Sequence, residues 1–324
     1  MVVALAYEPE VTEGVKMPHV PVMVDEVLEH LMGAGAKSVL DGTVGAGGHA
    51  EAILRANGDV TLIGIDRDPH ALDLARHRLE CFGDRVRLVH GLYDAFDNVL
   101  TADERVDAMF LDLGVSSMQL DQPDRGFSYA TAGPLDMRMS GDGRPASELL
   151  RHIGVEALAG VLREFGEVRR PRRIARRIQR AVDEGVMQST TDLRGAVRSA
   201  VGAAATPAEL SRVFQALRIA VNGELNLLSS FLAGAISHLS PGGRLVIISY
   251  HSLEDRMVKS FFKKESTMCL CPPEVPICVC GHVARLRVLT RRPMKPSASE
   301  ISSNKRSRSA RLRAAELMAE EATN

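Results

Sequence analysis

The sequence has no apolar run long enough to span a bilayer, so we expect no membrane-embedded segment. Its first residues, MVVALAYEPEVTEG, lack a basic stretch and soon turn acidic, so no signal peptide is expected. Only five cysteines occur among 324 residues. In the cytoplasmic protein that these absences predict, they would be reduced thiols or metal ligands rather than disulfides.

Net charge is also nearly absent, at −1, but the two signs are unevenly distributed. The stretch REFGEVRRPRRIARRIQR, residues 163–180, holds eight arginines and two acids. A second stretch, residues 285–313, holds ten basic residues and one acid. The rest of the chain is therefore acidic, and the two basic segments indicate a polyanionic partner held at chosen places.

Two phosphate-binding motifs are missing as well. Neither G-x-G-x-x-G nor Gly-Lys-Ser/Thr follows the first predicted strand, so neither a dinucleotide fingerprint nor a P-loop is supported. That strand instead runs into Asp41-x-x-x-Gly45-x-Gly47-Gly48, and the next strand ends in Asp66. Glycines let a ligand approach the main chain, and an acid after the second strand can accept both hydroxyls of a ribose. Because an acid repels a pyrophosphate and suits a cation, S-adenosylmethionine fits better than NAD; the alternative is an ordinary tight turn.

Strand and helix patterns alternate from KSVLDGTVG to VDAMFLDLG, which predicts β-α-β-α-β-α-β and a doubly wound parallel sheet. The next strand pattern is GGRLVIISY, residues 242–250, and RLRVLT and SARLRAAE are candidates for the last two strands. The long interval before residue 242 reads mainly as helices. We therefore predict a helical domain inserted at residues 128–211, with the core formed by residues 1–127 and 212–324.

Two helix starts can be predicted from local patterns. Residues 19–31, HVPVMVDEVLEHL, have apolar positions at helical spacing and predict a leading helix. The helix SLEDRMVKSFFKKE follows the fifth strand, and its pattern predicts Ser252 as N-cap with Asp255 at N3.

Seven stretches closely resemble the RsmH (MraW) family: HVPVMVDEVL, DGTVGAGGH, IGIDRDP, LDLGVSSMQLD, RGFSYATAGPLDMRM, FQALRIAVNGEL and GGRLVIISYHSLEDRMVK. They occur in the same order over roughly residues 19–313. Members of this family are bacterial small-subunit ribosomal RNA methyltransferases that methylate the N4 amine of one cytidine in the decoding centre, cytidine 1402 of 16S rRNA.

The resemblance implies an α/β fold, the Rossmann-like class I S-adenosylmethionine methyltransferase fold, with a mostly parallel seven-stranded sheet and an inserted helical domain. It also implies S-adenosyl-L-methionine as cofactor and 16S rRNA in the small ribosomal subunit as partner. Neither DNA nor a membrane is expected as a partner, and a homodimer is left open.

The cofactor residues follow from the family's motifs. The methionine end would be lined by the glycines and His49, the ribose held by Asp66, and the adenine contacted by Tyr93. The pocket would be completed from LDLGVSSMQLD by Asp112 and Gln119. Alternatives are a solvated histidine at a helix start, a core tyrosine and a surface glutamine. The resemblance thus gives the cofactor set Gly45, Gly47, Gly48, His49, Asp66, Tyr93, Asp112 and Gln119.

The candidate catalytic residues are Asp112 and His251. Asp112 ends the fourth strand and would accept a hydrogen bond or proton from the N4 amine; otherwise it only orients the cofactor. Its sequence, Asp-Leu-Gly-Val, departs from the Asp/Asn/Ser-Pro-Pro-aromatic motif common in amino-methyltransferases. His251 would face the target base, with a helix cap as the alternative.

Aromatic and basic residues are the candidate RNA contacts. Phe127 and Tyr129 would stack on an extruded base, unless they are packing residues at the domain junction. In the first basic segment, Arg170, Arg173 and Arg177 would pair with phosphates, the alternative being a solvated helix face. The second basic segment adds a contact or stays disordered.

Four of the cysteines lie close together, in CLCPPEVPICVC. Cys269, Cys271, Cys278 and Cys280 form a C-x-C-x6-C-x-C pattern that a structural zinc would suit. The usual zinc spacing is C-x2-C, and the alternative is a set of reduced packing thiols.

Two other functions remain open at this point. One is a non-catalytic RNA-binding assembly factor with a vestigial cofactor pocket, which the intact Asp66 and Asp112 disfavour. The other is a nicotinamide-dependent oxidoreductase, which the missing dinucleotide fingerprint disfavours.

Overall fold

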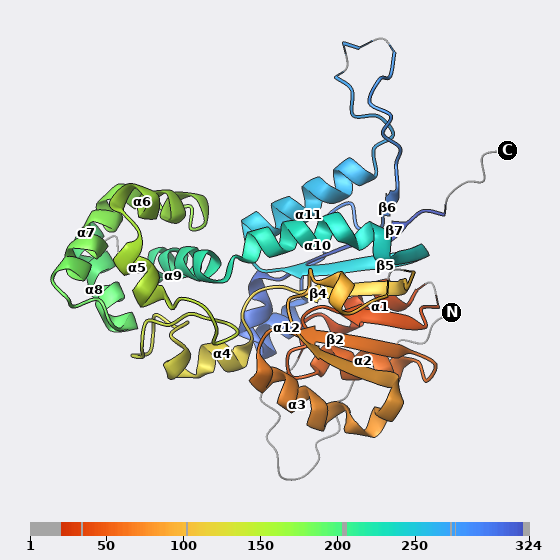
Figure 1. Cartoon of the computed structure of the whole chain (residues 1–324), viewed down its shortest axis with the longest axis horizontal. Helices are drawn as coiled ribbons and strands as arrows, with labels where there is room; N and C mark the ends of the chain where they lie inside the picture. Colours follow the sequence, from red (N-terminus) through yellow and green to blue (C-terminus); the bar gives the residue numbers. More distant parts are fainter. Residues whose placement is uncertain are drawn as a thin grey trace. The chain divides into compact units, whose positions relative to one another are not determined.

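The computed structural model describes residues 21–33, 35–101, 103–202, 206–272, 274–275 and 277–319 (Figure 1). The chain forms two compact units, which are described one at a time. Unit 1 comprises Met1–Gly114 and Leu227–Asn324, and unit 2 comprises Val115–Asn226.

Unit 1 is built on a seven-stranded sheet with the order β3-β2-β1-β4-β5-β7-β6. The first five strands of this order are parallel, and β7 is antiparallel to both of its neighbours. The predicted mostly parallel seven-stranded sheet is thereby confirmed. In chain order the strands are β1 Ser38–Asp41, β2 Thr61–Asp66, β3 Val86–His90, β4 Val106–Asp112, β5 Leu239–Ser249, β6 Leu286–Val288 and β7 Arg311–Leu317.

Apolar side chains cover both faces of this sheet. Alternate residues of one strand point to opposite faces, so Phe110 of β4 belongs to one core cluster, and Met109 and Leu111 to the other. A sheet buried on both faces needs helices on both sides, which is the three-layer arrangement of a doubly wound fold.

The cluster that contains Phe110 also contains buried residues of α1, α2 and α3. The cluster that contains Met109 and Leu111 also contains buried residues of α10 and α11. The helical elements of unit 1 are α1 Val24–Met32, α2 Gly48–Ala56, α3 Pro69–Leu79, η1 Glu80–Arg85, η2 Phe96–Asn98, α11 Ser252–Glu265, α12 Ala298–Ser303 and η5 Lys305–Ser309. Most of α10, Glu224–His238, also belongs to this unit. The predicted leading helix corresponds to α1, although residues 19 and 20 lie outside the described residues.

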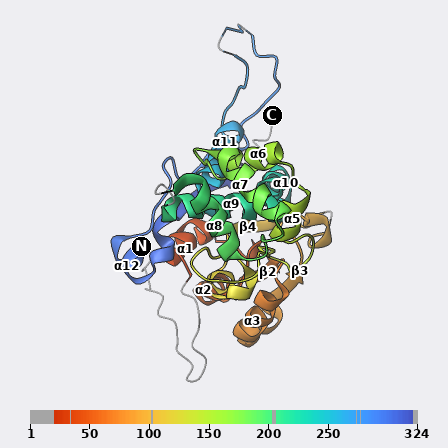
Figure 2. The same cartoon turned by 90° about the vertical axis from the view of Figure 1, so that its left-hand side faces the viewer.

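Unit 2 is helical and has a core of its own (Figure 2). Its elements are α4 Ser117–Asp121, η3 Pro123–Arg125, α5 Ala146–His152, α6 Val155–Glu164, α7 Pro171–Asp183, α8 Thr190–Val201 and α9 Pro207–Asn222. Among the described residues no single helix is long and apolar enough to cross a membrane, and α9 and α10 meet that criterion only together, as a bent pair.

The helical unit extends beyond the predicted insertion, residues 128–211, at both ends. Helix α9 continues past residue 211 and buries Phe214 and Leu217 in the core of unit 2. Upstream of residue 128, Leu120 and Phe127 pack against the same core. The boundaries differ because these residues are held by packing, whereas the prediction used only a change in pattern.

The second basic segment is folded over its described length. It contains β6, α12 and the start of β7, and several of its arginines form ion pairs within unit 1. Arg313 and Arg311 lie 2.7 and 3.1 Å from Asp255, and Arg285 lies 2.6 Å from Glu265. The disordered tail considered from the sequence is therefore wrong for residues 285–313, because these residues complete the sheet.

Candidate active site

Three acidic side chains lie where neighbouring parallel strands end. Asp41 ends β1, Asp66 ends β2 and Asp112 ends β4, and β1 lies between the other two strands. Burial raises the pKa of Asp41 most, and the charges of Asp112 and Asp66 raise it further. The three carboxyl groups therefore act on one another, at the edge where parallel α/β sheets bind ligands.

Asp41 is the most deeply buried of the three, with 0% of its surface exposed. Its Oδ1 accepts a hydrogen bond from the Thr43 N–H at 3.0 Å, whereas its buried Oδ2 has no partner among the described residues. Burial raises the pKa of Asp41 to about 8, although the Thr43 N–H opposes the shift. Asp41 is thus protonated at neutral pH. A molecule that supplies a partner for Oδ2 would remove the cost of an unsatisfied buried polar atom.

Asp66 fixes the glycine bend between β1 and α2. Its Oδ2 accepts the Gly45 N–H at 2.8 Å, and its Oδ1 accepts the Asp68 N–H at 2.8 Å. Gly45 and Gly47 have φ angles of 54° and 82°, which favour glycine, and a side chain at Gly47 would also contact Leu79. Burial raises the pKa of Asp66, and these two N–H groups lower it.

Gly48 and His49 are the first two residues of α2. His49 is 8% exposed, and its ring contacts Phe110 at a centroid distance of 4.8 Å. Its Nε2 donates to the Val22 carbonyl at 2.8 Å, so Nδ1 carries no proton in the neutral ring. Burial lowers the pKa of His49 to about 4, the Val22 carbonyl opposes this, and the charge of Arg78 adds to it. The solvated histidine considered from the sequence is therefore wrong.

Asp112 is held by several partners and remains partly accessible. Its backbone N–H donates to Thr43 Oγ1 at 2.7 Å, and its Oδ1 accepts the Tyr250 hydroxyl at 2.9 Å. Burial and then the charge of Asp112 raise the pKa of Tyr250, so this hydroxyl stays a donor. Asp112 Oδ2 lies 3.8 Å from His49 Nδ1, and the Asp112 side chain is 21% exposed. With neutral His49, these two atoms are neighbouring acceptors for a group that carries N–H bonds.

Helix α11 has a different cap from the predicted one. His251 is the N-cap: its Nδ1 accepts the Glu254 N–H at 3.4 Å, and Glu254 Oε2 accepts the His251 N–H at 3.3 Å. The prediction of Ser252 as N-cap with Asp255 at N3 is wrong, because Asp255 pairs with Arg313 instead. The His251 side chain is only 8% exposed. In this structure His251 serves as a helix cap. That role was the alternative to the prediction that His251 faces the target base.

The remaining predicted cofactor residues lie in different units. Tyr93 follows β3 and is half-buried, with its ring edge-on to Phe231 at 5.6 Å. Gln119 belongs to unit 2, where it is buried in α4. It forms a capping box with Ser116, in which each side chain accepts the other residue's N–H at 3.2 Å. This capping box accounts for the position of the Gln119 side chain within unit 2.

Both predicted base-stacking residues pack in unit 2. Phe127 is 6% exposed and belongs to the hydrophobic core, so the packing alternative describes it in this structure. Tyr129 is half-buried and meets Phe214 edge-on at 6.0 Å. Of the two rings, only Tyr129 keeps appreciable exposed surface.

Helix α7 forms an arginine-rich surface on unit 2. It buries Ile174 and Ile178 and turns its arginines to solvent. Two of these are paired: Arg172 with Glu156 at 3.0 Å and Arg180 with Glu184 at 2.9 Å. Within the described residues, no carboxylate lies within ion-pair distance of Arg163, Arg169, Arg170, Arg173, Arg176 or Arg177. The predicted contacts Arg170, Arg173 and Arg177 are thus exposed, and no described carboxylate pairs with them.

Two residues of the strand-end site were not selected from the sequence. Thr43 Oγ1 accepts the Asp112 N–H, and the Thr43 N–H donates to Asp41 at the end of β1. The Tyr250 hydroxyl donates to the Asp112 carboxylate. Both follow the carboxyl end of a strand, β1 or β5. That position already puts Tyr250 on the ligand side from the sequence, and it is the signal that could have found Thr43.

Comparison with known proteins shows the family of this chain. Residues 16–318 match the profile of the MraW methylase family. The ribosomal RNA small subunit methyltransferase H of Heliobacterium mobile is 46% identical over 308 residues, covering 92% of this chain and 98% of that protein. The protein of the same name from Geobacter sulfurreducens is 47% identical over 305 residues, with coverage of 92% and 98%.

Likeness to solved structures is weak. An rRNA methylase from Streptococcus thermophilus gives a TM-score of 0.38 at 11% identity over 87% of each chain, which adds nothing to the assignment. The profile and the relatives both cover most of the sequence. The chain belongs to the MraW methylase family.

Proposed function

We propose that this protein transfers a methyl group from S-adenosyl-L-methionine to the N4 amine of cytidine 1402 in 16S rRNA, in the cytoplasm. The observation that carries the proposal is the cluster of Asp41, Asp66 and Asp112 beside the glycine bend. The relatives' name, ribosomal RNA small subunit methyltransferase H, supports rRNA as substrate. The nucleotide and the N4 position come from the family resemblance. Membership of a methylase family leaves the oxidoreductase alternative without support.

The strand-end residues fit a cationic nucleoside. Asp66 suits the ribose, because each carboxylate oxygen that accepts a backbone N–H keeps a second lone pair for a hydroxyl. The acceptor pair of His49 Nδ1 and Asp112 Oδ2 suits an ammonium or amine group. Asp41 would meet a polar group through its unsatisfied Oδ2. When bound, S-adenosyl-L-methionine supplies an electrophilic methyl group on a sulfonium.

Asp112 is the candidate for the proton of the N4 amine. The lone pair of this amine is delocalised into the cytosine ring, so an acceptor bonded to its N–H helps to localise the pair. Asp112 is partly exposed, whereas Asp41 is fully buried and its raised pKa favours the protonated form. The Tyr250 hydroxyl orients the Asp112 carboxylate by donating to its Oδ1. The N4–H proton would pass to Asp112 as the N4–methyl bond forms and the sulfur–methyl bond breaks, with the neutral thioether as leaving group.

The arginines of α7 are the proposed RNA contact. Guanidinium groups bind phosphates in two-point contacts, and those of Arg170, Arg173 and Arg177 have no described carboxylate beside them. Helix α7 buries its apolar side, so these groups are presented on a folded surface rather than a flexible tail.

The test is methyl transfer from labelled S-adenosyl-L-methionine to small subunits isolated from cells that lack the enzyme. We expect label in one cytidine, recovered as N4-methylcytidine by nucleoside mass analysis and mapped by nuclease fragments. Subunits that already carry the modification are the control and should take up no label.

The same assay separates the enzyme from an assembly factor with a vestigial pocket. If the protein binds subunits but transfers no label, and calorimetry detects no S-adenosyl-L-methionine binding, the enzymatic proposal fails. Label at another nucleotide, or at another atom of the cytosine, would keep the methyltransferase and reject the proposed target.

A further inference from the structure

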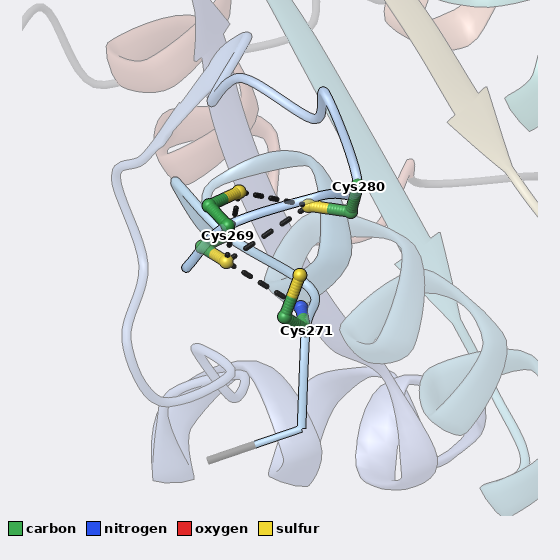
Figure 3. A group of neighbouring side chains, drawn as sticks. Cys269, Cys271 and Cys280 are labelled. Carbon is green, nitrogen blue, oxygen red and sulfur yellow. Dashed lines mark hydrogen bonds between the residues drawn. The ribbon is translucent and has the colours of Figure 1, made fainter. Parts of the chain in front are cut away.

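Four cysteine thiols converge in the loop that joins α11 to β6. In chain order Cys269 and Cys271 lie on the outgoing arm of the loop, and Cys278 and Cys280 on the returning arm. The loop projects beyond α11 and β6 (Figure 1), and Figure 3 shows Cys269, Cys271 and Cys280 close together. All four Sγ atoms lie within 4.8 Å of one another. Cys269 and Cys278 are 3.4 Å apart, and Cys280 lies 3.5 Å from Cys278 and 3.9 Å from Cys269.

These thiols are not packed in a hydrophobic core. Cys271 is half-buried, and the other three are exposed. The large apolar side chains of the loop are exposed too, so hydrophobic burial does not hold its arms together. These side chains are Met268, Leu270, Val275, Ile277, Val279 and Val283. The alternative of reduced packing thiols is therefore not supported by their surroundings.

The main chain of the loop points N–H groups at the sulfur atoms. Leu270 donates to Cys280 Sγ, Cys271 to Cys269 Sγ, and Val279 to Cys271 Sγ, each at 3.4 Å. N–H groups aimed at sulfur stabilise negative charge on it, and such outer contacts orient the ligands of metal sites. The two arms are thus already arranged to present thiolates.

Positive charge lies beside the thiols as well. Lys263 and Lys264 line a surface hollow together with Cys269 and Cys271. At the base of the loop, His282 donates to the Lys264 carbonyl at 2.9 Å. A divalent ion held by four thiolates carries a net charge of about −2, which nearby ammonium groups offset.

We propose that Cys269, Cys271, Cys278 and Cys280 bind one structural Zn²⁺ ion that ties the two arms of the loop together. Four sulfurs at the usual zinc distance form a tetrahedron with edges of about 3.8 Å, close to the separations seen here. Binding replaces the S–H protons of the four thiols, which pass to solvent. Four protein ligands leave no open position, so the ion has a structural role.

Other uses of four thiols fit the geometry less well. An iron–sulfur cluster places several metal and sulfide atoms between its cysteines, so it needs them farther apart. Two disulfides need S–S separations of about 2.0 Å, and the reducing compartment predicted for this chain disfavours them. Zinc needs neither a cluster nor an oxidant.

The experiment measures metal in the full-length protein. Protein purified without chelator is expected to contain about one zinc per chain by elemental analysis. After zinc is removed, titration with Co²⁺ should give thiolate-to-metal charge transfer and the strong visible bands of tetrahedral cobalt, saturating at about one equivalent. Hydrogen exchange at the Leu270 and Val279 amides should quicken when zinc is removed and slow again when it returns.

Variants identify the ligands. Cys269→Ser and Cys278→Ser should each lose most of the bound zinc, whereas Cys81→Ser, which changes the exposed fifth cysteine, should keep it. Circular dichroism checks that each variant is folded, and the cobalt titration of the unaltered protein tests the site without any variant. Folded protein that binds neither zinc nor cobalt would overturn the proposal, as would iron with sulfide, or a mass lower by four hydrogen atoms from two disulfides.

Discussion

Residues at the strand ends differ in their access to water, and this difference separates their roles. Asp41 is buried and protonated at neutral pH, whereas Asp112 is partly exposed and bonded to Tyr250. Neighbouring acids whose surroundings differ in this way can take different roles in one site. Asp41 can donate a hydrogen bond to a ligand, and Asp112 is placed to accept one.

The raised pKa of Asp41 predicts a pH-dependent loss of stability. Between the ordinary pKa of 3.8 and about 8, the unfolded chain loses this proton and the folded chain keeps it. The free energy of unfolding therefore falls as pH rises through this window, by roughly 1 kcal/mol per pH unit from this group. Asp41→Asn removes this dependence, so its stability relative to the unaltered protein should rise between pH 5 and pH 7.

Urea unfolding at pH 5, 6 and 7 measures this difference. Asp59→Asn, at an exposed position, is the matched control and should follow the unaltered protein at every pH. If the free energy of unfolding changes with pH in Asp41→Asn as it does in the unaltered protein, Asp41 is ionised in the folded state.

Asp112 is tested by its effect on turnover. Asp112→Asn keeps the shape of the side chain and removes a proton acceptor, so we expect kcat to fall by about 10²- to 10⁴-fold. Tyr250→Phe removes only the hydrogen bond that orients Asp112 and should cost less. Single-turnover methyl transfer measures the rate, and calorimetry measures cofactor affinity. Full turnover of Asp112→Asn with unaltered affinity would rule out the acceptor role.

The positions of site residues could be predicted from the sequence where those residues lie at the end of a strand. Asp66 and Asp112 end strands that the apolar patterns locate, so their common edge followed from the topology. The burial of His49 was not predictable, and the cap role of His251 was only the alternative to a role at the target base. Both depend on contacts, with Val22 and Glu254, that local patterns do not specify.

At the level of whole elements, the cap of α11 predicts a stability effect without a catalytic one. His251→Ala removes the acceptor for the Glu254 N–H and should lower the free energy of unfolding by about 1 kcal/mol. Cofactor affinity should stay unchanged. Ser252→Ala, at the first helical position, is the comparison and should cost less. Chemical denaturation and calorimetry test both variants; loss of methyl transfer in stable, cofactor-binding His251→Ala would restore a role at the target base.

Helix α7 predicts salt-dependent RNA binding. Reversing the charge of Arg170, Arg173 and Arg177 together should weaken binding to small subunits and reduce the slope of log K against log salt concentration by about 2. The control is the pair Arg172→Glu and Arg180→Glu, whose arginines form ion pairs with Glu156 and Glu184. Binding measured across a salt series gives the slopes. Unaltered binding of the triple variant, or a flat salt dependence of the unaltered protein, would contradict the contact.

Elements were predictable when their patterns were long. The four alternating strands and their helices come from apolar repeats, and α7 from its arginine-rich face. The start of α11 was misplaced by one residue, because Ser252 and Asp255 have the composition of a cap while tertiary ion pairs engage Asp255 elsewhere.

On the scale of the whole molecule, unit 2 has the features of an independent folding unit. Its buried residues come from α5 to α9 and from the segment of residues 127–139 before them, and they form one continuous core. We predict that residues 115–226, expressed alone, give a helical protein that unfolds cooperatively and binds RNA but not S-adenosyl-L-methionine. Circular dichroism and calorimetry test this. A fragment that is unfolded at low temperature would show that its core depends on unit 1.

The overall arrangement could be predicted in part from the sequence. The fold class follows from the alternating pattern, but the limits of unit 2 do not, because α9 and the segment before residue 128 are assigned by packing alone. The antiparallel placement of β7 between β5 and β6 also depends on long-range pairing that no short stretch of sequence encodes.

The position of β7 has a consequence for biosynthesis. This strand is the last of the seven to be translated, yet it lies inside the sheet, between β5 and β6. Until the ribosome has released Leu317, β5 presents an unpaired edge and Asp255 lacks Arg311 and Arg313. A nascent chain stalled before this strand therefore carries an open edge prone to pairing with other chains, and the synthesis of β7 is the step that closes this edge.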